Sequence, residues 1–155
     1  MASNLRRFCN FGFNILRYVT CLNGSGFISK FRNGTNLVEN QNNTETFIKL
    51  ASVLSGLPNE IRIEGHTDSG AIIPGSQLER QFGNNWGLSA ARAIVILEKL
   101  FENDQTGKLD RNKYSVAGYA DTRPMASNDL PDGRALNRRV DIVIVRSDVT
   151  YYNQR

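Results

Sequence analysis

The sequence predicts an α/β (α+β) two-layer sandwich, in which helices cover a small, mixed four-stranded sheet. Two observations predict this class. Segments with the two-residue alternation of strands are separated by segments with the helical period, in the order strand, helix, strand, helix, strand, short helix, strand. The 155 residues, of which 40% are hydrophobic and 22% charged, also have the ordinary composition of one compact domain.

The first half of this order contains two strands and a helix. Residues 26–31 are an extended apolar segment followed by a turn, and they form the first predicted strand. Residues 44–56 repeat apolar side chains at helical spacing until Gly56 and Pro58 end the helix. Residues 61–66 alternate, so one face should enter the core while the other faces outward or toward a site. The polar positions on that second face are Arg62, Glu64 and His66.

The second half begins with a long loop, residues 69–85, and loops of this length are often functional. Ser89 is the expected N-cap of the strongest helix. Its predicted core face consists of Ala90, Ala93, Ile94, Leu97, Leu100 and Phe101. Residues 114–118 and 140–144 alternate as the last two strands, and the polar connection between them contains a short helical stretch.

Composition and charge exclude several classes of protein. No run of about 18 apolar residues is present, so no conventional membrane-spanning helix is predicted. The formal charge is +4, but residues 1–30 contain four of the 19 basic residues and no acid, which leaves 15 basic against 15 acidic groups in the rest. A nucleic-acid-binding domain usually carries its excess charge on the folded body, so we expect no nucleic-acid partner.

Residues 1–25 differ in composition from the rest and form an N-terminal extension of unknown role. Their apolar stretch is short and polar for a signal peptide. The segment could be an ordered extension, a membrane-surface segment or the remnant of a longer chain. Cys9 and Cys21 permit a disulfide or two ordinary thiols. The predicted domain spans residues 26–146, and residues 147–155 are a C-terminal tail.

Arg92 is the first candidate for a ligand-binding residue. If the helix starts at Ser89, this cation lies in the first turn and faces the positive end of the helix dipole, at a cost of about 0.3 to 1 kcal/mol. An anion bound by Arg92 and the nearby backbone N–H groups would relieve that cost. An internal salt bridge, for example to Asp68, would relieve it as well.

Asp68 is the second candidate, because it stands where a strand ends and a long loop begins. If it lies near Arg92, the pair offers one group for an ammonium and one for a carboxylate, which suits an amino-acid-like ligand.

Strand alternation sends Arg138 and Arg139 to opposite sides, so one can reach the site while the other braces the fold. His66 is the one histidine of the chain and is expected to be structural.

Two separated blocks carry a family resemblance that covers residues 26–146. The first includes Glu64, Gly65, His66, Thr67, Asp68, Asn85, Trp86, Leu88, Ser89, Arg92 and Ala93. The second includes Gly118, Tyr119, Asp121, Arg123, Asn128, Gly133, Arg134, Asn137, Arg138, Arg139 and Val140. Both resemble the OmpA-like peptidoglycan-binding domain family. The Asn-Asn-Trp sequence at residues 84–86 and the long loop before it most resemble the periplasmic domain of the flagellar stator protein MotB.

This resemblance implies non-covalent binding of peptidoglycan through the diaminopimelate of its stem peptide. By the family pattern, Asp68 takes the ammonium and Arg92 the carboxylate of that residue. Thr67, Asn85, the backbone of Leu88, Arg138 and Phe31 should complete the site. Stem peptides with lysine lack the carboxylate, so they should bind less well. Removing either charged group should cost about 2 to 5 kcal/mol.

The resemblance also implies a periplasmic, wall-associated protein without a cofactor or metal, which anchors a cell-envelope or motor component. A homodimer and other envelope or stator proteins are the implied partners. Residues 1–30 lack the helix with a proton-binding aspartate that a stator protein carries, so torque generation by this chain alone is not expected. A hydrolase using Asp68 and His66 is the enzymatic alternative, but no activated Ser or Cys nucleophile accompanies them. A protein-interaction adaptor with a degenerate wall site is the other alternative.

Overall fold

The computed structural model of the protein describes residues 44–145. Within this range the sheet has three strands in the order β2-β1-β3. The central strand β1 (Ile61–Gly65) is parallel to β2 (Tyr114–Gly118) and antiparallel to β3 (Val140–Ile144). The predicted mixed α/β architecture is therefore confirmed, and all three described strands were predicted.

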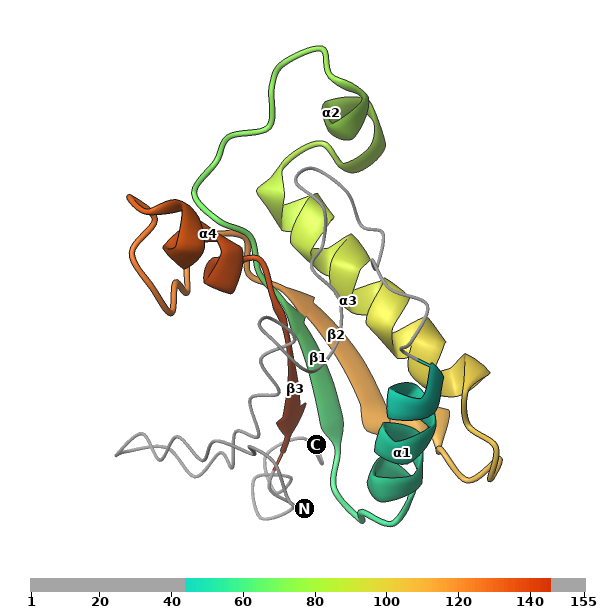
Figure 1. Ribbon diagram of the computed structural model, residues 1–155. Helices are drawn as coiled ribbons and strands as arrows, with labels where there is room; N and C mark the ends of the chain where they lie inside the picture. The colour runs from blue at the N-terminus through green and yellow to red at the C-terminus, as the bar shows by residue number, and fades with distance from the viewer. Residues whose placement is uncertain (1–43, 146–155) are drawn as a thin grey trace, which may run out of the picture.

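The long helices lie on one face of this sheet (Figure 1). Helix α1 (Thr44–Ser55) precedes β1, and α3 (Asn85–Glu102) connects β1 to β2 through the short 3₁₀ helix η2 (Arg111–Lys113). Helix α4 (Pro131–Asn137) precedes β3 and corresponds to the predicted short helical stretch. The predicted strand at residues 26–31, the N-terminal extension and the C-terminal tail lie outside the described residues.

The hydrophobic core lies between the sheet and the two long helices. Helix α1 contributes Phe47, Ala51 and Leu54, which are the buried residues of the face that its helical period predicts. Strand β1 contributes Ile61 and Ile63. The remaining members are Ala93, Ile96, Leu100, Leu109, Val140 and Ile142. In α1 and β1 the apolar positions that sequence periodicity selects are therefore the positions that pack in the core.

Helix α3 begins four residues before the predicted start at Ser89. Its N-cap is Asn84, whose side-chain oxygen accepts hydrogen bonds from the backbone N–H groups of Trp86 and Gly87. Ser89 is buried inside the helix, where its hydroxyl donates to the carbonyl of Trp86 and accepts from the N–H of Ala120. The predicted core face was consequently wrong in part, because Ile94 is exposed and Ile96 is buried.

Two glycines let α3 cross the sheet at very short distance. Gly65 and Gly118 are register partners at the ends of the parallel strands. A Cβ on Gly65 would lie 1.9 Å from the carbonyl oxygen of Ser89, and one on Gly118 would lie 2.7 Å from the backbone nitrogen of Ala90. Only residues without a side chain allow this approach. The start of α3 is thereby held directly over the ends of β1 and β2.

The long predicted loop between β1 and α3 contains a short helix, α2 (Gln77–Phe82). Ser76 caps it by accepting from the N–H of Glu79, and the carboxylate of Glu79 in turn accepts from the N–H of Gly75. This reciprocal arrangement resembles a capping box, so the Ser-x-x-Glu spacing could have predicted the helix. The segment was expected to be a loop because glycines and a proline surround it.

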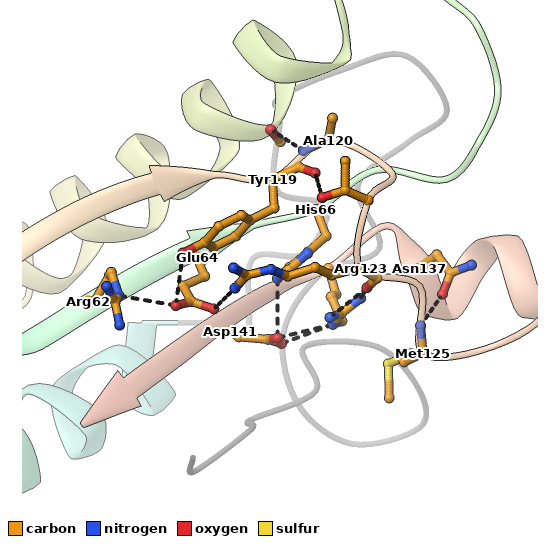
Figure 2. Close-up of polar contacts among 12 residues, drawn as sticks. Arg62, Glu64, His66, Tyr119, Ala120, Arg123, Met125, Asn137 and Asp141 are labelled. Carbon is orange, nitrogen blue, oxygen red and sulfur yellow. Dashed lines mark hydrogen bonds and ion pairs between the residues drawn. The ribbon is translucent and has the colours of Figure 1, made fainter. Parts of the chain in front are cut away.

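Part of the second face of the sheet, on β1 and β3, is buried as well, which the sequence did not indicate. Glu64 and His66 alternate with the core residues of β1 as predicted, yet both are almost inaccessible to solvent. Figure 2 shows them gathered with Asp141 from β3, with Arg62 of β1 itself and with Arg123 from the connection after β2.

In residues 44–145, no helix has the length and apolar character needed to cross a membrane.

Candidate functional site

A pocket of about 400 Å³ lies at the carboxyl end of β1. It is lined by the segment that follows β1, by the first half of α3, by residues of α4 and by the connection that contains α2. All predicted site residues within the described range line this one pocket: Thr67, Asp68, Asn85, Leu88, Arg92 and Arg138. The remaining one, Phe31, lies outside the described residues. Residues that are far apart in the sequence are thus brought together as the sequence analysis expected, and their binding roles stay predictions.

Asp68 lines the pocket and is held by two contacts. Its Oδ2 accepts from Nη1 of Arg138 at 2.6 Å, and its Oδ1 accepts from the backbone N–H of Gly70 at 3.1 Å. The second contact is the local turn that aspartate commonly makes at the end of a strand. The first was not anticipated, because the sequence suggested Arg92 as the ion-pair partner. Asp68 is therefore a preformed, oriented carboxylate.

Arg92 also lines the pocket and is only 1% exposed. Its Nη1 donates to the carbonyl oxygen of His66 at 3.3 Å. Burial lowers the pKa of Arg92 to about 10, while the charge of Asp68 raises it and that of Arg138 lowers it further. Arg92 stays charged at neutral pH, at a desolvation cost that an anionic ligand would offset.

The predicted reason for singling out Arg92 was wrong, although the residue does line the pocket. Because α3 starts at Asn85, Arg92 lies about two turns into the helix, where the helix dipole is weak. The first free N–H groups of the helix are capped by Asn84. The anion-binding character of the site therefore comes from buried guanidinium charge and not from the helix terminus.

Three further residues complete the predicted set. Asn85 donates from its side-chain amide to the carbonyl of Gly70 at 2.9 Å and so ties the loop to the helix. Leu88 lines the pocket, and its backbone N–H already donates to the carbonyl of Asn84. Thr67 is buried, and its hydroxyl oxygen has no hydrogen-bond partner among residues 44–145. A residue that lines the pocket thus carries a hydroxyl that is unsatisfied within the described part of the chain.

The C-terminal motif braces the fold beside the pocket. Asn137 accepts from the N–H groups of Met125 and Ala126 and donates to the carbonyl of Ala126, so it fixes the connection before α4. Arg139 is buried and donates to Asp141 and to the carbonyl of Arg123. Arg138, one position earlier, points to Asp68 in the pocket. The prediction that these two arginines face opposite sides is confirmed.

A second polar cluster lies on the other face of the sheet and consists of Glu64, His66 and Asp141. One ligand atom from each lies within 4.8 Å of the others, which is a spacing that a metal ion could use. However, Arg62 lies 3.1 Å and Arg123 3.7 Å from the Glu64 carboxylate (Figure 2). These guanidinium groups, together with Arg139 on Asp141, already neutralise both carboxylates. We therefore assign the cluster a structural role.

His66 belongs to this cluster and not to the pocket. Its ring stacks on Tyr119 with the centroids 5.6 Å apart, and its Nε2 lies 3.3 Å from Oδ2 of Asp141. Its backbone N–H donates to the carbonyl of Arg139. Strand alternation alone would place residues two positions apart on the same face, but β1 ends at Gly65, and His66 and Asp68 face different environments. The pair does not form an acid–base dyad.

Two features of the pocket were missed by sequence reasoning. Arg134 lines it from α4, one helical turn before Arg138. This four-residue spacing could have indicated a shared face. The second feature is an apolar wall formed by Ile72, Ile73 and Leu78. No periodic pattern marks these residues, because two of them belong to an irregular segment.

Comparison with known proteins identifies the family. A family model described as the OmpA family matches residues 31–138, which include Asp68, Arg92 and Arg138. The chain belongs to the OmpA family. This membership confirms the resemblance on which the sequence analysis relied.

Several curated relatives match about two thirds of this chain. The uncharacterized protein YtxE of Bacillus subtilis (strain 168) is 38% identical over 109 residues, which are 70% of this chain and 42% of the relative. Motility protein B of the same organism is 35% identical over 113 residues, 70% of this chain and 40% of the relative. Peptidoglycan-binding protein ArfA of Mycobacterium tuberculosis (strain ATCC 25618 / H37Rv) is 34% identical over 101 residues, 64% of this chain and 27% of the relative. The chain thus spans less than half the length of these relatives.

Solved structures agree with the OmpA-family fold. The cell wall anchor of the T6SS from Pseudomonas aeruginosa has a TM-score of 0.58 and 28% identity, with coverage of 74% of this chain and 73% of that chain. The periplasmic domain of Helicobacter pylori MotB has a TM-score of 0.65 over 86% of this chain and 76% of that chain. Its identity is 23%, so this likeness concerns the fold alone. The expected relationship to MotB periplasmic domains is confirmed.

Proposed function

We propose that this OmpA-family domain binds peptidoglycan non-covalently through the diaminopimelate of the stem peptide and so anchors an envelope or motor component to the cell wall. The observation that carries the proposal is the presence of Asp68 and Arg92 in one pocket of about 400 Å³. The printed functions of two relatives support it, since ArfA is a peptidoglycan-binding protein and the Pseudomonas aeruginosa structure is a cell wall anchor.

The chemistry of the ligand matches the charges of the pocket. The side-chain end of diaminopimelate carries an ammonium and a carboxylate on one carbon atom. The carboxylate would pair with the guanidinium of Arg92, whose planar donors suit bidentate binding. The ammonium would share the carboxylate of Asp68 with Arg138. Each ligand charge thus meets a protein charge that is already oriented, which lowers the entropic cost of binding.

The same chemistry predicts selectivity between two types of cell wall. A lysine side chain ends in an ammonium alone, so it could use Asp68 but would leave Arg92 without its anion. A buried charge that finds no partner on the wrong ligand strongly disfavours binding of that ligand. Diaminopimelate-type walls should therefore be bound in preference to lysine-type walls.

We further propose a periplasmic, wall-associated location, where a homodimer or other envelope or stator proteins would be partners.

The proposed role is binding of peptidoglycan without its hydrolysis. Asp68 and His66 do not meet in the pocket, which removes the geometric basis for the hydrolase alternative. Purified peptidoglycan should therefore be retained intact, and release of muropeptides that depends on Asp68 would contradict this part of the proposal.

The proposal is tested by sedimentation of the protein with purified diaminopimelate-type sacculi. The wild type should sediment with the sacculi, whereas Asp68→Ala and Arg92→Ala should remain in the supernatant. Arg111→Ala is the matched control, because it removes an arginine from η2, at the opposite end of β2 from the pocket. Circular dichroism should show that all variants are folded. Wild-type retention of both site variants would refute the site and favour an adaptor that binds other envelope proteins.

A further inference from the structure

The pocket carries more positive charge than the proposed ligand group can neutralise. Three arginines, Arg92, Arg134 and Arg138, line it, and Asp68 is the one carboxylate among the lining residues, so the formal charge is +2. The ammonium and carboxylate of diaminopimelate add no net charge at this end of the ligand. The ligand carboxylate would pair with Arg92. The ligand ammonium would pair with the Asp68 carboxylate, which already accepts from Arg138. Arg134 is left without a role in the proposed function.

The geometry of Arg134 suits an anion. Its Nη1 donates to the carbonyl oxygens of Asn128 at 2.8 Å and Asp129 at 3.1 Å, so neutral acceptors hold the guanidinium in place. Among residues 44–145, no carboxylate lies within ion-pair distance of it, and its Nε and Nη2 make no hydrogen bond. The side chain is half-buried and lines the pocket. It is thus an oriented cation with two donor nitrogens available.

We propose that Arg134 forms a second carboxylate subsite, which binds a carboxylate of the stem peptide other than the one assigned to Arg92. This inference rests on the proposed function. Two carboxylates flank diaminopimelate in a stem peptide. One is the α-carboxylate of the preceding D-glutamate, which is linked through its γ-carboxyl group, and the other is the carboxylate at the C-terminus of the peptide. By binding either carboxylate, the pocket would recognise a ligand charge beyond the side-chain end of diaminopimelate.

The subsite makes the domain sensitive to amidation of the wall peptide. An amide has the shape of a carboxylate but no charge, and it presents N–H groups toward the guanidinium donors. A charge-assisted hydrogen bond would be lost and two donors would face each other. Amidation of the carboxylate that Arg134 binds should therefore lower the affinity by about 10- to 100-fold.

The test is calorimetric titration with four synthetic tetrapeptides, L-alanyl-γ-D-glutamyl-diaminopimelyl-D-alanine and its forms amidated at the glutamate, at the C-terminus or at both. With the wild type, amidation at one of the two positions should weaken binding by the stated factor, and this identifies the source of the carboxylate. With Arg134→Gln, the unmodified peptide should bind about as weakly as that amide, and the same amidation should have no further effect.

The possible outcomes separate this inference from the proposed function. If the wild type binds all four peptides equally, the second subsite is refuted while diaminopimelate binding stands. If the wild type binds none of them, both proposals fail. Because Arg134 also holds two carbonyl oxygens, Arg134→Lys serves as a second variant that keeps the charge. It should retain most of the discrimination, and a loss of discrimination equal to that of Arg134→Gln would contradict a charge-based subsite.

Discussion

The guanidinium of Arg138 donates to the carboxylate of Asp68 at 2.6 Å, although 70 positions separate the two residues in the chain. Both side chains are mostly buried, with 18% and 17% of their surfaces exposed. The ion pair joins the segment that follows β1 to the residue that caps the end of α4, and both residues line the pocket. A ligand ammonium would enter beside Arg138 and share the carboxylate with it.

This burial predicts measurable coupling between the two residues. A double-mutant cycle with Asp68→Asn and Arg138→Gln should give a coupling of at least about 1 kcal/mol in the free energy of unfolding, because shielding from water strengthens the pair. Lys99 and Glu102 form the matched control, with the same 2.6 Å distance but 44% and 58% exposure. Their cycle should give a smaller coupling. Equal couplings in the two cycles would show that burial does not strengthen the Asp68 pair.

Arg92 should be dispensable for folding but essential for binding. Its lowered pKa of about 10 means that the charged form, present at neutral pH, is disfavoured by burial. Asp68 retains Arg138 as a partner when Arg92 is removed, so this carboxylate keeps a compensating charge. Arg92→Met should therefore change the free energy of unfolding by less than about 1.5 kcal/mol. Affinity for diaminopimelate peptides should fall about 30-fold or more.

Denaturant unfolding and calorimetric titration of the same preparations distinguish these effects. A large loss of stability in Arg92→Met would mean that the guanidinium is mainly a structural brace, held by its bond to the carbonyl of His66. Unchanged affinity would mean that it does not contact the ligand. Either result would show that the burial of Arg92 does not by itself imply a role in ligand binding.

The close crossing of α3 over the sheet predicts that Gly65 tolerates no side chain. A Cβ at this position would lie 1.9 Å from the carbonyl oxygen of Ser89, which belongs to helix backbone and has little freedom to move. Gly65→Ala should cost about 3 kcal/mol of stability, measured by urea unfolding. In the control, Gly56→Ala, the added Cβ lies 3.6 Å from the carbonyl of Val53, an ordinary contact. That variant should stay within about 0.5 kcal/mol of the wild type.

Acid should remove a stabilising turn after α3. Asp104 accepts a hydrogen bond from the hydroxyl of Thr106 at 2.6 Å and one from the N–H of Leu109 at 2.9 Å, and these contacts lower the pKa of Asp104 below its ordinary value of 3.8. Because the folded pKa is below the unfolded one, the stabilisation is complete above the unfolded pKa and is lost as pH falls through the folded pKa.

Asp104→Asn should therefore have a lower melting temperature than the wild type at neutral pH. The difference should shrink as pH falls below about 4, where the wild-type carboxylate becomes protonated. Thermal unfolding followed by circular dichroism between neutral and acid pH measures this convergence. A difference that is independent of pH would mean that the ionised carboxylate contributes nothing beyond its shape.

Much of the fold could be predicted because its apolar side chains follow simple periods. Helix α1 and strands β1, β2 and β3 were placed correctly for this reason. The start of α3 was missed because the buried face of this helix includes two polar residues, Ser89 and Arg92, which periodicity assigns to solvent. Their burial depends on partners from other segments, such as the N–H of Ala120, and a local sequence window does not contain that information.

The predicted site residues of the described range lie together in one pocket, and their binding roles stay predictions. Sequence reasoning and family resemblance missed Arg134 and the apolar wall, and the Asp68 partner turned out to be Arg138. Such pairings depend on how α4 docks beside the end of β1, and this is a tertiary property. The buried cluster of Glu64, His66 and Asp141 was missed for a similar reason, since charged side chains in an alternating strand normally face solvent.

The central claim is that Arg92 recognises the carboxylate that distinguishes diaminopimelate from lysine. The most direct measurement is calorimetric titration of the wild type and Arg92→Met with two stem tripeptides that differ in this residue alone. The wild type should prefer the diaminopimelate peptide by about 30-fold or more, and Arg92→Met should bind both peptides with similar, weak affinity. Equal affinity of the wild type for both peptides, or a preference that survives in Arg92→Met, would contradict the claim.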